Sequence, residues 1–151
     1  MKIHIVIDAG LSEEEIIIRC RALNPKISKI QRAVDQIVGE MQTIPCYQNQ
    51  AEFFLTAAQI LFFQTDAEQV YAHTAEQVYL VKLRLYELEQ RLSADFVRVS
   101  KSALVNLRHV LSIERNLTSA SLIRFHQSHK QLYVSRYYYK ILRERMHLAL
   151  S

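Results

Sequence analysis

The sequence predicts an α+β fold in which antiparallel β-strands dominate. Many short strand-like runs follow one another at close spacing, helical segments are few and short, and strands and helices do not alternate regularly. A length of 151 residues fits one domain with a short accessory element, and a hydrophobic content of 50% fits a globular protein with a core. We expect residues 1–44 to form the accessory element and residues 45–151 to form the main domain.

The accessory element is predicted to have the order strand, strand, helix. Residues 2–8 (KIHIVID) place isoleucine at every second position, which is typical of a half-buried strand, and residues 15–20 (EIIIRC) indicate a second strand. Asn24 and Pro25 are typical of a helix N-cap and first helical position, and apolar residues then recur at helical spacing as far as Met41. This helix could pack on the core or pair with the same helix of a second copy.

The main domain is expected to contain a series of strands and a few small helices. The expected strands cover residues 52–56, 59–65, 69–74, 76–82, 96–100, 110–115, 121–126 and 131–136. The pattern predicts helices over residues 83–92 and 137–150, and the composition of residues 102–107 suggests a helical turn.

Charge is distributed very unevenly along the chain. Residues 1–50 are neutral overall and residues 51–95 carry a net charge of −4, whereas residues 96–151 hold ten Lys or Arg against two acids, a net charge of +8. A basic region of this size is what a phosphate-contacting surface needs. An ordinary solvated face is the alternative explanation.

Two clusters in the basic region carry the side chains that bind phosphates and bases. Ser, Lys and Arg donate to phosphate oxygens, and Lys or Arg also bind guanine in the major groove. The clusters are residues 98–102 (RVSKS) and residues 135–140 (SRYYYK). We expect base and phosphate contacts from both, with at least one of the three consecutive tyrosines of the second cluster packed inward. The candidate DNA-binding residues are Arg98, Ser100, Lys101, Ser102, Arg108, Lys130, Arg136, Tyr137 and Lys140.

Enzymatic and metal-binding functions find little support in the sequence. It contains no nucleophile elbow, zinc-protease motif, P-loop or dinucleotide-binding fingerprint. His126 and His129 have no acid or Cys close by in sequence, and Cys20 and Cys46 are too few for a zinc site. We therefore expect no enzyme activity, no cofactor and no metal. Without a signal peptide or a long apolar run, a cytoplasmic location is expected.

The runs FVRVSKSALVNLRHVLSIE, IRF and LYVSRYYYKILRE resemble the LytTR DNA-binding domain of bacterial transcription regulators. The runs ILFFQTDAEQVYAHT and LRLYELEQRL resemble the upstream half of the same domain, so the resemblance covers about residues 45–148. Residues 1–44 are similar to the N-terminal part of small stand-alone LytTR proteins, which lack a receiver domain.

This resemblance implies an elongated arrangement of antiparallel sheets with small helices between them. It implies a DNA-binding transcription regulator that recognises paired direct repeats, with loops that enter successive major grooves of double-stranded DNA. Base contacts would come from residues 66–69, from residues 100–102, and from Arg136 and Tyr137. The first loop departs from the family, because Asp66 and Glu68 make it acidic. Asn106 matches a family position, and we interpret it as a turn-stabilising residue.

The resemblance also suggests partners. A site of two repeats would bring two subunits together on DNA, and a homodimer is one way to do so. Stand-alone members of the family are often restrained by a membrane protein encoded nearby, which would act as an inhibitor. Two other functions remain open: a protein-interaction module whose basic face binds an acidic partner or an anionic membrane surface, and an RNA-binding protein that stacks bases on exposed tyrosines.

Overall fold

The computed structural model describes the backbone of residues 1–150 and the side chains of residues 1–148. Within this range the chain forms ten strands, three α-helices and two 3₁₀ turns, as the sequence predicted for a β-rich α+β protein. The helices are α1 (Pro25–Met41), α2 (Leu85–Arg91) and α3 (Arg136–Leu150), and the 3₁₀ turns are η1 (Ala57–Gln59) and η2 (Leu107–His109). The strands are β1 (Thr43–Gln48), β2 (Ala51–Thr56), β3 (Phe62–Asp66), β4 (Gln69–His73), β5 (Val78–Val81), β6 (Phe96–Ser100), β7 (Ala103–Asn106), β8 (Val110–Glu114), β9 (Ser121–Phe125) and β10 (Gln131–Val134).

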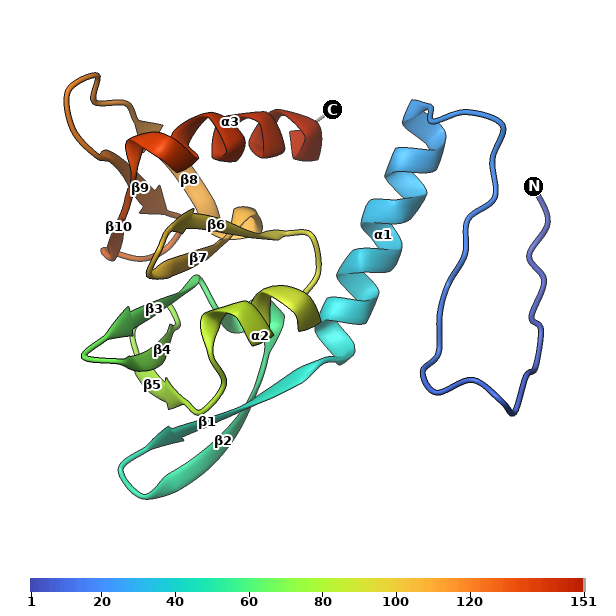
Figure 1. The fold of residues 1–151 in the computed structure, drawn as a ribbon, viewed down its shortest axis with the longest axis horizontal. Helices are drawn as coiled ribbons and strands as arrows, with labels where there is room; N and C mark the ends of the chain where they lie inside the picture. The colour runs from blue at the N-terminus through green and yellow to red at the C-terminus, as the bar shows by residue number, and fades with distance from the viewer. Residues whose placement is uncertain (151) are drawn as a thin grey trace.

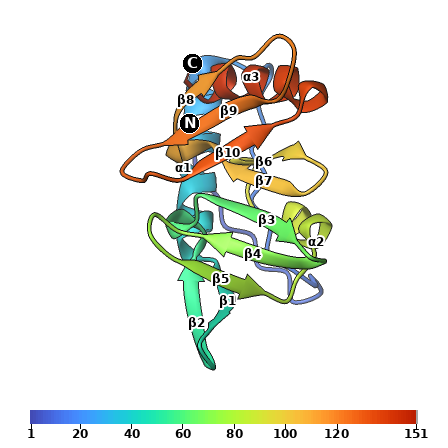
Figure 2. The ribbon, with the colours of Figure 1, turned by 90° about the vertical axis from the view of Figure 1, so that its left-hand side faces the viewer.

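The strands form two antiparallel sheets. The larger has seven strands in the order β2-β1-β5-β4-β3-β7-β6, and the smaller has three in the order β10-β9-β8. In Figures 1 and 2 the β1–β2 hairpin extends from one end of the molecule, and α3 lies with the small sheet at the other end. In both views the small sheet lies beyond β6 and β7, on the side away from the β1–β2 hairpin.

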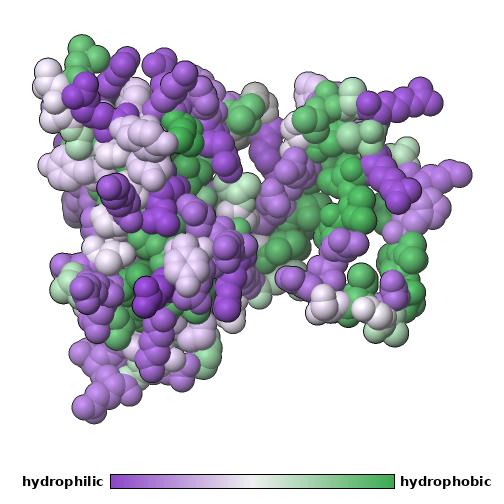
Figure 3. All heavy atoms as spheres, viewed as in Figure 1, coloured by the Kyte–Doolittle hydropathy of each residue, from purple (hydrophilic) through white to green (hydrophobic). Residues whose placement is uncertain are grey.

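Helix α1 begins as the sequence predicted. The Asn24 side chain accepts a hydrogen bond from the Ile27 amide at 3.0 Å, and Pro25 occupies the first turn, where its missing N–H costs nothing. Ile27 is the buried residue of this helix, which leaves much of its apolar face uncovered. Figure 3 shows hydrophobic side chains over α1 and the preceding segment on the right of the view.

The two strands predicted before α1 are wrong. Residues 2–8 and 15–20 are extended but form no strand, and all of these residues are exposed. A two-residue period shows that side chains alternate between two faces, whereas a strand also needs a neighbour to receive its backbone hydrogen bonds. Within the described part of this chain, neither stretch has such a neighbour.

The helical turn predicted at residues 102–107 is also wrong. Residues 103–106 form β7, which pairs with β6 on one side and β3 on the other. All four residues are buried, and a short, continuously apolar run of this kind does not distinguish an inner strand from a helical turn. Strand β1, which was not predicted, contains Pro45 between its paired residues.

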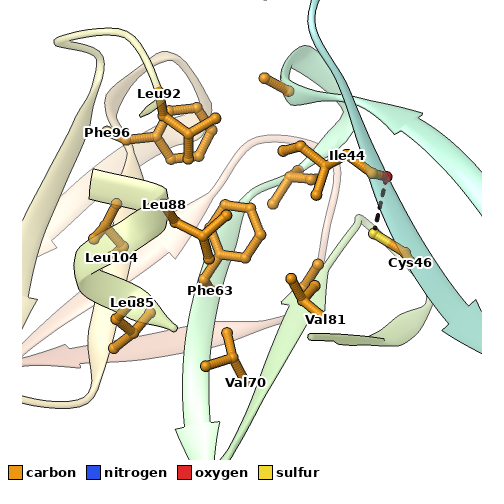
Figure 4. Packing of buried hydrophobic residues seen from close by; sticks show 13 residues of the cluster. Ile44, Cys46, Phe63, Val70, Val81, Leu85, Leu88, Leu92, Phe96 and Leu104 are labelled. Atoms are coloured by element: carbon orange, nitrogen blue, oxygen red, sulfur yellow. Dashed lines mark hydrogen bonds between the residues drawn. The ribbon is translucent and has the colours of Figure 1, made fainter. Parts of the chain in front are cut away.

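Two hydrophobic cores hold the sheets and helices together. The first lies between the large sheet and α2, where Phe63, Leu88 and Leu104 are almost completely buried (Figure 4). The second joins β6 and β7 to the small sheet and α3, through residues such as Val99 and Leu142. Because β6 and β7 lie between the two cores, the turn that connects them has a firmly packed base.

Candidate nucleic-acid interface

The structure brings three predicted segments together at one side of the molecule. The Thr65 amide donates to the Ser102 carbonyl at 2.8 Å, which places the β3–β4 turn beside the β6–β7 turn. The Ser135 amide donates to the Val99 carbonyl at 2.9 Å, which places the start of α3 on the other side of the same turn. Figure 2 shows the three segments above one another on the right of the view. We call residues 66–69, 100–102 and 135–140 the loop face.

Lys101 projects from a turn that is held in place by its neighbours. The Ser100 hydroxyl accepts from the Ser102 amide at 3.1 Å and lies 3.3 Å from the Ser102 hydroxyl. The Arg98 guanidinium donates to the Lys101 carbonyl at 2.9 Å and pairs with Glu89 at 3.3 Å. The Lys101 side chain is exposed and, among the described residues, has no hydrogen bond or ion pair. Its ammonium group therefore keeps three donors for a ligand.

The start of α3 presents a second free cation. The Ser135 carbonyl accepts from the amides of Tyr138 and Tyr139, both at 3.1 Å, and this begins the helix. Arg136 is exposed and has no hydrogen bond or ion pair among the described residues. The buried Ser135 hydroxyl also lacks a partner there, which the sequence analysis did not anticipate.

The tyrosines of α3 divide between core and surface, as predicted. Tyr138 and Tyr139 pack against the second core, and Arg115 covers the Tyr139 ring at 5.1 Å. Tyr137 is 78% exposed, with its ring edge-on to Tyr138 at a centroid distance of 4.9 Å. Lys140 is exposed one helical turn after Arg136. The N-terminal end of α3, which lies next to Lys101, thus presents two cations and one aromatic ring. They belong to Arg136, Lys140 and Tyr137.

The acidic β3–β4 turn has basic neighbours that the sequence analysis missed. Ala67 and Glu68 have φ of 48° and 67°, which is the conformation of a tight two-residue hairpin turn. A surface groove that includes Glu68 is also lined by Lys82 and Arg84. Lys82 and Arg84 belong to residues 51–95, whose net charge is −4, so the charge of that stretch gave no sign of a basic surface. The fold nevertheless places both residues beside the loop face.

Arg108, one of the candidate DNA-binding residues, lies away from the loop face. It follows β7, while Asp95 precedes β6, so both residues lie at the end of these antiparallel strands opposite Lys101. The Arg108 guanidinium pairs with the Asp95 carboxylate at 2.5 Å and contacts the Arg32 carbonyl at 3.5 Å. Arg108 therefore joins α1 to the segment that precedes β6.

Lys130 is also placed away from the loop face. It precedes β10, whereas Arg136 follows that strand. Its ammonium group donates to the Gln77 carbonyl at 2.5 Å and to the His73 Nδ1 at 3.3 Å. Burial, with the Lys130 charge beside it, lowers the pKa of His73 to about 4, and burial also lowers the pKa of Lys130. These contacts join the small sheet to the large one, so Lys130 stabilises the packing between the two sheets.

Asn106 is confirmed as a turn-stabilising residue. It is 1% exposed, its amide group donates to the Ile60 carbonyl at 3.0 Å, and its side-chain oxygen accepts from the Arg108 amide at 3.1 Å. These bonds hold the turn after β7 against the segment before β3. They leave no part of the side chain for DNA.

The described residues offer neither a metal site nor a membrane span. No three His, Cys, Asp or Glu side chains gather closely enough among them to hold a metal ion. No helix in the same range has the length and apolar character needed to cross a bilayer.

Comparisons with known proteins agree with this architecture. The family described as the LytTr DNA-binding domain matches residues 51–147. Proteins named uncharacterized HTH-type transcriptional regulators, from Staphylococcus aureus strains NCTC 8325 and COL, are each 32% identical over 97% of this chain and 98% of their own length. The solved LytTr DNA-binding domain of a Bacillus cereus protein superimposes with a TM-score of 0.64 at 20% identity, covering 70% of this chain and 96% of that one. The chain belongs to the LytTr DNA-binding domain family.

Proposed function

We propose that this protein is a sequence-specific, non-enzymatic transcription regulator that contacts double-stranded DNA through its loop face. The observation that carries the proposal is the pair of backbone hydrogen bonds that hold the Lys101 turn between the β3–β4 turn and the start of α3. These bonds set two unpaired cations, Lys101 and Arg136, on rigid supports side by side. Membership of a family of DNA-binding domains supports DNA as the ligand.

The loop face has the chemistry that groove recognition requires. A major groove is about 12 Å wide, and Lys or Arg entering it can bind the O6 and N7 atoms of guanine. In this proposal Lys101 and Arg136 read bases. Ser100, Ser102, Tyr137 and Lys140 bind phosphates around them, and Arg98 holds the Lys101 backbone in place. Arg108 and Lys130, which lie elsewhere, make no DNA contact.

The proposed DNA site consists of two direct repeats. One loop face contacts only part of a turn of duplex, so two subunits in the same orientation would occupy two half-sites about one helical turn apart. A membrane protein that holds the regulator away from DNA would be a compatible control mechanism. This part of the proposal rests on the resemblance to stand-alone LytTR regulators.

In vitro selection from a random duplex library, with the full-length protein at about physiological salt, tests the proposed function. Enrichment of a direct repeat is the expected result. Binding that merely follows the total DNA concentration, with no enriched motif, would overturn sequence-specific regulation. In that case binding to vesicles with anionic lipids would indicate a membrane-facing interaction module, and preference for single-stranded RNA would indicate an RNA-binding protein.

A further inference from the structure

The segment before α1 carries many large apolar side chains that nothing in the described chain covers. The exposed fractions of Ile3, Ile5 and Ile7 are 91%, 88% and 92%, and those of Ile16 and Ile17 are 67% and 64%. Single exposed apolar residues are ordinary on protein surfaces, but a contiguous set of this size indicates an interaction site. The segment also has unpaired backbone groups, because no backbone hydrogen bond joins residues 2–8 to residues 14–20.

Residues 14–20 run beside α1, and no backbone hydrogen bond joins them to a neighbouring strand in the described chain. Ile16, Ile18 and Cys20 line an open groove of about 810 Å³ against α1, and Glu14 and Glu15 before them line the same groove. Ile17 does not line this groove. One face of the segment is thus turned towards α1, and its backbone edge remains free to pair with another extended chain.

The charges of this segment fit a second copy of the same segment. Glu13, Glu14 and Glu15 precede three isoleucines, and Arg19 and Arg21 follow them. If two copies pair antiparallel with Ile17 opposite Ile17, Glu15 of each copy lies opposite Arg19 of the other, and Glu13 lies opposite Arg21. Opposite charges directly across an antiparallel pair stabilise it. The first stretch repeats this arrangement, because antiparallel pairing about Ile5 would place Lys2 opposite Asp8.

The same charges disfavour one way of pairing the two stretches within a single chain. A hairpin that aligns the isoleucines of residues 3–7 with those of residues 16–18 would put Asp8 opposite Glu15 and Lys2 opposite Arg21. Like charges directly opposite each other destabilise a strand pair.

We propose that residues 13–21 form the interface of a homodimer, in which two copies pair antiparallel about Ile17. The interface is isologous, since the same surface is used by both copies, and the exposed apolar residues of α1 that flank it, Ile37, Val38 and Met41, extend it. It lies on the side of the molecule away from the loop face, so pairing leaves both loop faces free (Figure 1). Because a two-fold axis relates the two copies, one dimer does not present its loop faces in the same orientation, and the two half-sites of a direct repeat would be filled by subunits of two different dimers.

Charge reversal in the full-length protein tests this interface. Glu15→Arg and Arg19→Glu each oppose like charges at two symmetric places and should weaken dimerisation by about tenfold or more in sedimentation equilibrium. An equimolar mixture of the two variants should form a heterodimer, because the arginine introduced at position 15 then faces the glutamate introduced at position 19, and the unchanged Arg19 faces the unchanged Glu15. The double variant Glu15→Arg/Arg19→Glu should recover the homodimer. Unchanged dimerisation of the single variants, or no association in the mixture, would overturn the proposal.

Cysteine crosslinking tests the register independently. In a Cys20→Ser background, Ile17→Cys should form an intermolecular disulfide on mild oxidation, because paired positions in an antiparallel ladder have Cα atoms about 4.5–5.5 Å apart. Ile18→Cys is the matched control, since residue 18 would lie opposite residue 16 and out of bonding range of its own counterpart. The native Cys20 should also fail to crosslink, since its counterpart would be about 20 Å away. Equal crosslinking at positions 17, 18 and 20 would contradict the register.

The dimer proposal is separate from the proposed function. A monomeric charge-reversal variant should still bind a single half-site, because the loop face is unchanged. Loss of half-site binding in Lys101→Ala with normal dimerisation would concern the loop face alone. Circular dichroism of each variant checks that the fold is intact.

Discussion

Individual residues of the same type have different functions here because their surroundings differ. Lys101 and Lys130 both lie in the basic part of the chain, and nothing in the order of residues separates them. The structure leaves the Lys101 ammonium group exposed, whereas Lys130 donates to Gln77 and His73 in the contact between the two sheets. Composition and motif identify the cations, but only the pairing of strands shows which end of the molecule each one reaches.

Asn106 provides a stability test at this scale. Asn106→Ala should lower the free energy of unfolding by about 1–3 kcal/mol, because the Ile60 carbonyl and the Arg108 amide lose their partner in a buried place. Urea denaturation measures the change. Asn116→Ala is the matched control, since Asn116 also accepts from a backbone amide, that of Thr118, but is exposed. Equal losses in both variants would show that burial of Asn106 has no special importance.

At the scale of elements, the sequence predicted most of the strands and all three helices. The failures share one cause, which is that hydrogen-bond partners distant in sequence decide whether an extended run becomes a strand. Residues 103–106 become a strand because β3 and β6 lie on either side. Residues 2–8 and 15–20 have the better strand pattern but no neighbour in the described chain.

The β6–β7 turn is the element on which the site depends. Arg98 supports it through its bonds to the Lys101 carbonyl and to Glu89, with 20% of its side chain exposed. Arg98→Met, which keeps the apolar stem, should weaken specific DNA binding by about 0.5–1.5 kcal/mol because the turn loses one fixed hydrogen bond.

Fluorescence anisotropy with the selected DNA measures this effect. Arg98→Lys keeps the charge but not the forked guanidinium geometry, and it should resemble Arg98→Met if Arg98 positions Lys101. Full recovery by lysine would instead show that Arg98 contributes only its charge.

At the scale of the whole molecule, the fold separates the charged and apolar surfaces. The loop face lies on the side opposite α1 and the N-terminal segment (Figure 1). Two of the cations that the sequence analysis named as candidate DNA-binding residues, Arg108 and Lys130, make contacts within the protein, away from the loop face. The sequence analysis also missed Lys82 and Arg84, which the fold brings beside the β3–β4 turn.

A surface that binds phosphates should make DNA binding strongly dependent on salt. The logarithm of the association constant should fall linearly with the logarithm of salt concentration, with a slope of about −0.9 for each phosphate contacted. Lys140→Ala should reduce the steepness by about one such unit, because it removes one phosphate contact in our account. Affinity that stays constant as salt is raised would contradict an electrostatic interface.

The most direct test of the central claim compares Lys101→Ala and Arg136→Ala with Lys26→Ala, which removes an exposed charge from α1 instead. We would measure the affinity of each variant for the selected duplex and for a random duplex by fluorescence anisotropy. The account predicts a loss of about 1–3 kcal/mol on the selected duplex for the two loop-face variants, a smaller loss on random DNA, and little change for Lys26→Ala. Equal losses on both duplexes would show that Lys101 and Arg136 contact only phosphates, and an equal effect of Lys26→Ala would contradict the loop face as the DNA-binding surface.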